Sequence, residues 1–166
     1  KYWKDIVGQI EKLHIQNAST DNKEYIKNEK LLSVDKKIVD DLINVVNIKY
    51  SINLMECLYI AMAIALNKLT NEEKIIIELE GHGREELEEM LPIDRTVGWF
   101  TSKYPVIFNV YDDIDMTISK NKEALRNIPN SGIGYGVLRY LCNEVNDQYC
   151  GKMLLNYHGE FSENNE

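Results

Sequence analysis

The chain has few cysteines, and their spacing matches no metal or disulfide pattern. Cys57, Cys142 and Cys150 are odd in number, and no two of them stand in a CxxC arrangement. An odd count argues against a disulfide framework, and the missing CxxC argues against a zinc site. We therefore expect reduced thiols, a cytoplasmic location and no bound metal.

An excess of basic charge and long apolar runs are also missing. The 166 residues carry 19 Lys and Arg against 27 Asp and Glu, and no basic face stands out that would bind nucleic acid. The longest apolar run, from Leu58 to Leu66, is too short to cross a bilayer. No signal peptide opens the chain, and because Lys1 is not an initiator methionine we interpret the sequence as an excised or processed fragment. Neither nucleic acid nor membrane is an expected partner.

What the chain does contain is enough apolar sequence for a core. Hydrophobic residues make up 44% of it, and no internal repeat is present. Polar residues 16–30 lack periodicity and predict a loop or linker, and Ser33 is a candidate N-cap for the helix after it. Apolar residues at helical spacing predict helices in residues 1–15, 34–50, 51–69, 115–129 (an exposed helix closed by Pro129) and 135–145.

Strand signals alternate with these helices. Three consecutive isoleucines predict a strand in residues 73–83, and further strands are expected in residues 96–111, interrupted at Pro105, and in residues 152–161. A short helical turn is expected from Glu85 to Glu89. The alternation of helices and strands predicts an α/β fold.

One charged constellation follows the isoleucine strand. Glu80, His82 and Arg84 occupy alternate positions, with Gly81 and Gly83 between them. If the strand persists, the three polar side chains share one face, and the glycines permit another backbone or a ligand to approach the other. This pattern suits a carboxylate held at a crevice, and it is equally compatible with an ordinary solvated strand end.

Four ordered motifs resemble a known family. They are Glu-Gly-His-Gly-Arg-Glu at 80–85, Arg-Thr-Val-Gly-Trp-Phe-Thr-Ser-Lys-Tyr-Pro-Val at 95–106, Pro-Asn-Ser-Gly-Ile-Gly-Tyr-Gly at 129–136 and Leu-Asn-Tyr-His-Gly-Glu-Phe at 155–161. Their order and approximate spacing resemble those of epimerization domains of nonribosomal peptide synthetases, in the condensation-domain superfamily. The segment before Arg95 departs from the family, which usually has Asp-x-Ser-Arg-Thr there.

The resemblance implies a particular domain organisation. A whole domain has two halves, each similar to chloramphenicol acetyltransferase, and the N-terminal half carries a His-His-x-x-x-Asp-Gly motif. That motif is absent here, because His14, His82 and His158 are isolated. Residues 1–30 are thus expected to form an N-terminal helix and linker, and residues 31–166 a C-terminal subdomain with a mixed sheet and packed helices.

The resemblance also implies an activity. A carrier protein delivers an aminoacyl or peptidyl thioester on its phosphopantetheine arm, and the enzyme converts the L form to the D form at Cα. No cofactor is expected to bind directly. The expected partners are a peptidyl carrier protein domain, the N-terminal half and other synthetase modules, and the fragment alone is expected to be inactive.

Residue roles follow by position. Glu80 matches the candidate catalytic carboxylate, which would work with a His of the missing half. Asn156 and Tyr157 either orient substrate and steady the enolate or serve as ordinary strand-end residues. Supporting roles are expected for the remaining candidates: His82 beside Glu80, Arg84 and Arg95 in ion pairs, Trp99 in the core or tunnel wall, and Tyr135 in a glycine-rich turn that either enters a helix or approaches the pantetheine arm.

Two other functions stay open. One is a condensation domain that forms peptide bonds, and the other is a non-catalytic member of the superfamily that docks carrier or tailoring proteins.

Overall fold

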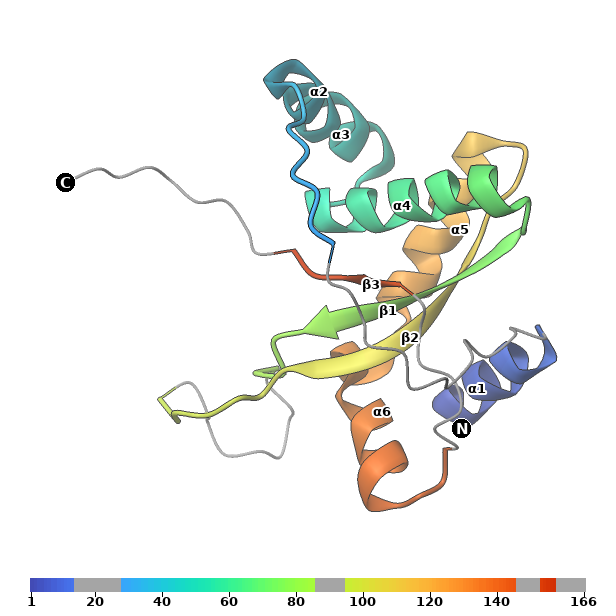
Figure 1. Ribbon diagram of the computed structural model, residues 1–166, viewed down its shortest axis with the longest axis vertical. Helices are drawn as coiled ribbons and strands as arrows, with labels where there is room; N and C mark the ends of the chain where they lie inside the picture. The colour runs from blue at the N-terminus through green and yellow to red at the C-terminus, as the bar shows by residue number, and fades with distance from the viewer. Residues whose placement is uncertain (14–27, 86–94, 146–152, 158–166) are drawn as a thin grey trace.

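A mixed three-stranded sheet lies at the centre of the part described by the computed structural model, which comprises residues 1–13, 28–85, 95–145 and 153–157. The strand order is β2-β1-β3, with β1 at Lys74–Gly81, β2 at Ser102–Asn109 and β3 at Leu154–Leu155. Strand β1 pairs antiparallel with β2 and parallel with β3. Figure 1 shows α4 above β1, α1 and α6 below β2, and α5 running behind the strands. The predicted α/β class with a mixed sheet and packed helices is confirmed.

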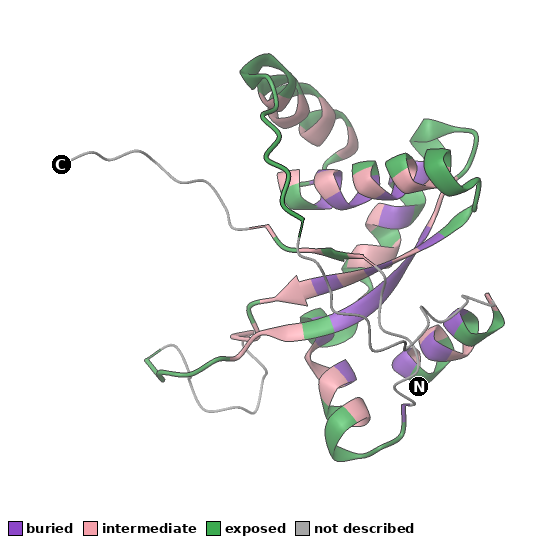
Figure 2. Cartoon of the chain, in the orientation of Figure 1, coloured by how far each residue is buried: buried purple, intermediate pink, exposed green. Residues whose placement is uncertain are grey.

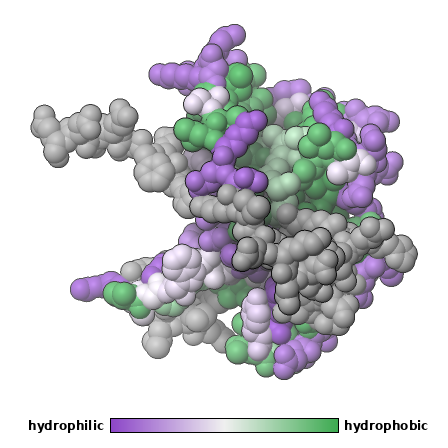
Figure 3. All heavy atoms as spheres, in the orientation of Figure 1, coloured by the Kyte–Doolittle hydropathy of each residue, from purple (hydrophilic) through white to green (hydrophobic). Residues whose placement is uncertain are grey.

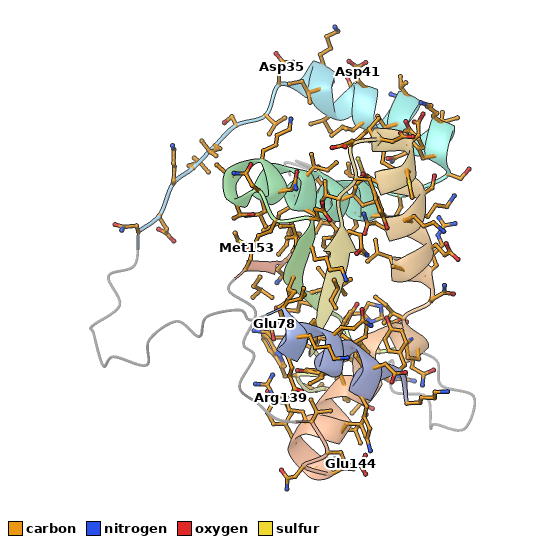
Figure 4. The ribbon with its side chains drawn as sticks, turned by 90° about the vertical axis from the view of Figure 1, so that its right-hand side faces the viewer. Asp35, Asp41, Glu78, Arg139, Glu144 and Met153 are labelled. Carbon is orange, nitrogen blue, oxygen red and sulfur yellow. The ribbon has the colours of Figure 1, made fainter. Side chains whose placement is uncertain are left out.

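Strand β2 runs through Pro105, so the predicted interruption is wrong. The backbone N–H of Glu78, which is paired with Pro105, donates instead to the carbonyl of Met153 on the opposite side of β1 (Figure 4 labels Glu78 and Met153). In an antiparallel pair, the backbone N–H and C=O groups of the two residues point either toward each other or away from each other. The Glu78 N–H points away from β2, so the nitrogen of Pro105 points away from β1. A proline is tolerated there because no ladder hydrogen bond is lost. The strand begins at Ser102, not at Thr96 as expected.

Helix α4 covers the sheet from one side. It spans Leu54–Thr70 and starts with a capping box, in which the Asn53 side chain accepts from the Glu56 N–H and the Glu56 carboxylate accepts from the Asn53 N–H. It ends at Asn71, whose left-handed backbone stops the helix. The helix predicted over residues 51–69 is confirmed, although it starts at Leu54 and includes Thr70.

A second helical segment precedes α4. It consists of α2 (Lys36–Asp41), a π-helical stretch η1 (Leu42–Val46) and α3 (Asn47–Tyr50). Asp35 is the N-cap, because its carboxylate accepts from the Lys37 N–H at 2.7 Å, so the expectation of Ser33 as cap is wrong. Hydrophobic residues gather on the surface over α2 to α4 in Figure 3, and the exposed ones include Ile38, Val45 and Ile48.

Helix α1, Tyr2–Lys12, packs into the same core as the sheet. The Trp3 ring contacts the rings of Tyr104 and Tyr135, with centroids 5.8 and 5.2 Å apart. Figure 2 shows buried residues on α1 and along both long strands. The predicted N-terminal helix is confirmed over residues 2–12, while the expected linker largely lies outside the described residues. The subdomain boundary at residue 30 stays a prediction.

Helix α5, Ile114–Arg126, has a buried face, so the expectation of an exposed helix is wrong for that face. Asn121 is buried, its amide nitrogen donates to the Asn109 carbonyl at 2.7 Å and its amide oxygen accepts from the Asn109 N–H at 2.9 Å. A polar side chain can be buried when it forms hydrogen bonds with the backbone groups at a strand end, as Asn121 does. Because part of the buried face of α5 is therefore polar, a search for apolar residues at helical spacing does not find it. The helix ends before Pro129, because Ile128 takes the extended conformation favoured before proline.

The glycine-rich segment enters the last helical region. Short helical elements follow in order: η2 (Pro129–Gly132), α6 (Ile133–Gly136) and η3 (Val137–Leu141). The helix predicted over residues 135–145 therefore starts earlier, at Ile133, and ends earlier, at Leu141. Among the described helices none is by itself long and apolar enough to cross a membrane, although the bent pair Lys36–Tyr50 and Leu54–Thr70 passes on length and composition.

Candidate active site

A pocket of about 570 Å³ lies where β1 and β3 end. Because these two strands are parallel, the residues that follow each of them meet at one edge of the sheet. Leu79 pairs with Leu155, so Glu80 and Asn156 come next on adjacent strands. The lining includes five residues that come from these strand ends: Glu80, Gly81, His82, Asn156 and Tyr157. The structure thus brings together the three residues predicted as catalytic, Glu80, Asn156 and Tyr157.

The Glu80 side chain is largely withdrawn from solvent. It is 14% exposed, and its Oε2 lies 3.9 Å from Nζ of Lys103, which is opposite it on β2. The Lys103 side chain is half exposed, so this long ion pair is screened by water. Glu80 is therefore a carboxylate at the pocket wall with one weakly held counter-charge.

His82 lies beyond the end of β1. Its Nδ1 accepts from the Arg84 N–H at 3.0 Å, and its Nε2 lies 3.1 Å from Oε1 of Glu85. Since Nδ1 is an acceptor, the proton of the neutral ring belongs on Nε2, where it is donated to Glu85. The ring is 67% exposed and both its nitrogens are engaged with the loop residues Arg84 and Glu85, so the expected role of orienting Glu80 stays a prediction.

The chain turns at Gly83, so the expected continuous face from Glu80 to Arg84 does not form. Gly83 has φ +69°, and a Cβ there would lie 1.6 Å from the Phe100 carbonyl oxygen. Only glycine fits such a close backbone approach in a left-handed conformation. The glycine between His82 and Arg84 therefore accommodates another backbone. The helical turn expected at Glu85–Glu89 lies outside the described residues except for Glu85, which is not helical.

Arg84 fastens the segment that leads into β2. Its guanidinium donates to the carbonyls of Thr96 and Gly98, at 2.9 and 3.3 Å, and lies 4.3 Å from the centroid of the Phe100 ring. Arg84 therefore holds this segment in place through hydrogen bonds to its backbone and through a cation–π contact with the Phe100 ring.

Three other predicted residues lie outside the pocket lining. Trp99 is 88% exposed, so the expectation of a core position does not hold for it. Arg95 is exposed, and no ion pair to it occurs in the described ranges, so its pairing role stays a prediction. Tyr135 is buried against Trp3, and burial raises the pKa of its hydroxyl. Tyr135 is thus a core residue in this structure, and its supporting role stays a prediction.

Gly132 explains the glycine-rich motif. It has φ +90°, and a Cβ there would lie 1.9 Å from the ring of Tyr104. The glycine therefore lets the turn close over a pocket-lining tyrosine, which supports the interpretation as a tight turn into a helix. No group of three His, Cys, Asp or Glu side chains is placed to hold a metal ion in the part that the structure describes.

Comparisons with known proteins identify the family of this chain and a similar fold. A sequence model of the condensation domain matches residues 1–164. The chain belongs to the condensation-domain family. It is 40% identical over 134 residues to bacitracin synthase 3 of Bacillus licheniformis, covering 78% of this chain and 2% of that protein. It is 40% identical over 146 residues to gramicidin S synthase 1 of Brevibacillus brevis, covering 86% of this chain and 13% of that protein.

A solved structure is also similar. The epimerization domain from the third module of tyrocidine synthetase B matches with a TM-score of 0.57 and 27% identity, over 87% of this chain and 35% of that chain. This condensation-family chain therefore spans a small part of the synthetases it resembles and about a third of that solved chain.

Several pocket residues of this condensation-family chain were missed by sequence reasoning, four of them polar side chains on helices and a strand. Tyr59, Glu56, Tyr104 and Arg126 line the pocket from α4, β2 and α5. Burial, and then the charge of Glu80, raise the pKa of Tyr59, and burial chiefly raises the pKa of Tyr104 to about 12. Tyr104 lies inside a quoted motif, but nothing local marks Tyr59 or Arg126, since each reaches the pocket through helix packing.

Proposed function

We propose that the chain is the C-terminal part of an epimerization domain, which converts an L-aminoacyl or peptidyl thioester to the D form. The observation that carries the proposal is the convergence of Glu80, Asn156 and Tyr157 on one pocket from the ends of two parallel strands. The similarity to an epimerization domain of tyrocidine synthetase B adds support. The four motifs in family order point the same way.

The chemistry requires two groups on opposite faces of the substrate. A thioester acidifies its α-carbon, but removal of the proton still needs a base within hydrogen-bond reach, and its return needs an acid on the other face. Glu80 serves as one of these groups. A histidine of the N-terminal half-domain serves as the other, and the two exchange roles when the reaction runs from D to L.

Asn156 and Tyr157 have places suited to substrate positioning. They follow β3 directly and line the pocket with Glu80. Their amide and hydroxyl groups supply donors and acceptors that hold the thioester with its Cα–H bond toward the base. In this proposal the substrate arrives on the phosphopantetheine of a carrier protein domain, and no other cofactor takes part.

Deuterium incorporation at Cα tests the proposal. The chain is joined to its N-terminal half-domain, a carrier protein is loaded with an L-aminoacyl thioester, and the reaction runs in D₂O. Mass spectrometry then reads the label in the released amino acid. Glu80→Gln is expected to lower the labelling rate about 10²–10⁴-fold, the usual contribution of a positioned acid or base.

Glu78→Gln is the matched control. Glu78 precedes Glu80 by two residues on the same strand and does not line the pocket. It is expected to label at the wild-type rate. Absence of label in a folded wild-type protein, across several amino acids, would overturn the epimerase proposal.

The second candidate is a condensation domain that forms peptide bonds. The family model that matches the chain bears that name, which is the observation in its favour. A wild-type protein that joins a donor thioester to an acceptor amine without labelling Cα would support this candidate instead.

A further inference from the structure

Tyr59 lies at the pocket without a role in the site described above. It projects from α4 and is 4% exposed, and it lines the same pocket as Glu80. Among the described residues its hydroxyl has no hydrogen-bond partner, and the same holds for Tyr104. The Tyr59 side chain is buried, but its hydroxyl is not among the buried polar atoms that lack a partner, so the hydroxyl is accessible at the pocket and can donate to a ligand there.

Tyr59 is better placed than Tyr104 to act beside Glu80. Both tyrosines line the pocket with Glu80, and burial is the first cause that raises the pKa of each; the charge of Glu80 comes next for Tyr59, whereas Tyr59, Glu85 and Tyr2 come next for Tyr104. The Tyr104 ring also packs against Gly132 and Trp3, which fixes it toward the core. A group that acts on the substrate must lie near the carboxylate, because the carbonyl oxygen is only two bonds from the carbon that loses its proton.

The protonation state of Tyr59 suits a donor. Burial raises the pKa of its hydroxyl, and the negative charge of Glu80 raises it further. The hydroxyl therefore keeps its proton throughout the neutral range. A donor that is neutral and held by a buried ring does not have to reorganise when negative charge develops on the substrate.

We propose that the Tyr59 hydroxyl donates a hydrogen bond to the thioester carbonyl oxygen and stabilises the enolate formed in epimerization. This inference rests on the proposed function and adds a catalytic residue to it. Tyr59 contributes from α4, whereas Asn156 and Tyr157 contribute from the end of β3.

The electron balance of the step is simple. The base takes the Cα proton, the C–H electron pair forms a carbon–carbon double bond, and the carbonyl π pair moves to oxygen. Tyr59 keeps its proton and donates only a hydrogen bond to that oxygen. When the opposite acid returns a proton to Cα, the carbonyl reforms, with no oxidation or reduction.

Tyr59→Phe tests the proposal in the joined domain with its loaded carrier protein. Loss of one such donor typically lowers kcat about 10²–10³-fold. We expect a fall of that size in the rate of Cα labelling, with KM changed much less, because the bond strengthens as the enolate forms. Tyr2→Phe is the control, since Tyr2 is a partly buried tyrosine outside the pocket lining, and it is expected to label at the wild-type rate.

The outcomes separate the two proposals. Labelling by the wild type together with a wild-type rate in a folded Tyr59→Phe variant would overturn the role of Tyr59 alone. A variant that raises KM at constant kcat would also overturn it, because that result describes binding without transition-state stabilisation. Poor folding of Tyr59→Phe could also lower labelling, so a second variant carries 3-fluorotyrosine at position 59. This variant retains the hydroxyl, and if the hydroxyl acts as proposed it should label Cα at close to the wild-type rate. No label in the wild type would overturn the epimerase function itself.

Discussion

Arg126 holds the carboxylate of Glu56 with two nitrogens at once. Its Nε lies 3.1 Å from Oε1 and its terminal nitrogen lies 3.3 Å from Oε2. The same terminal nitrogen donates to the Ser51 carbonyl at 2.6 Å. Since Glu56 also closes the capping box of α4, this pair ties the start of α4 to the end of α5 at the pocket wall.

Loss of this pair should cost stability. Arg126→Met keeps the aliphatic stem but leaves the mostly buried Glu56 carboxylate without its cation. We expect the free energy of unfolding to fall by about 1–2 kcal/mol, measured by urea denaturation. Lys120→Met on the same helix removes an exposed pair with Glu123 at 3.5 Å and should change it by less than about 0.5 kcal/mol. Equal effects would contradict a special role for Arg126.

Gly132→Ala should be strongly destabilising. The residue has φ +90°, and the new methyl group would overlap the Tyr104 ring. We expect a loss of more than about 2 kcal/mol in the free energy of unfolding.

Gly136→Ala is the matched comparison, because its Cβ would meet nothing closer than 3.9 Å. It lies in α6 and should be neutral or stabilise by up to about 1 kcal/mol. A neutral Gly132→Ala would show that the turn can shift away from Tyr104.

Tyr104 should make the protein sensitive to alkaline pH. Its folded pKa of about 12 lies above the ordinary value of 10.0, so the folded state retains a proton that the unfolded state releases. The stability contribution is complete below pH 10 and is lost as pH rises from there through 12. The loss amounts to about 2–3 kcal/mol at most.

Tyr104→Phe removes this titration. The difference in unfolding midpoint between pH 9 and pH 11 should therefore be smaller in the variant than in the wild type, measured by circular dichroism. An unchanged difference would show that Tyr104 does not titrate differently in the folded and unfolded states.

His82 should matter less to catalysis than Glu80. Both its ring nitrogens are engaged with Arg84 and Glu85, and the ring is mostly exposed. His82→Ala is expected to lower the rate of Cα labelling by no more than about 10-fold, well short of the loss for a positioned acid or base. A loss equal to that of Glu80→Gln would instead identify His82 as a proton-transfer group.

Local patterns were enough for most of the elements and for part of the site. Three isoleucines predicted β1, and the apolar run after Asn53 predicted α4, because both signals lie within a single element. The motif order indicated the family, and with it Glu80, Asn156 and Tyr157, whose meeting follows from parallel pairing of their strands.

Other features depend on contacts between distant segments. Pro105 is tolerated because β2 is an edge strand in the described sheet, and Gly83 is needed because Phe100 passes close to it. Asn121 is buried because Asn109 satisfies its amide. None of these partners is implied by the residue's own neighbours in sequence.

The sequence by itself therefore determined most of the strands and helices, the family and the candidate carboxylate Glu80. Only the tertiary structure decided which side chains line the pocket with that carboxylate, since Tyr59 and Arg126 join the lining from α4 and α5. The physical reason is that secondary structure follows from periodicity over a few residues, whereas a pocket is made by burial and hydrogen bonds between segments far apart in the chain.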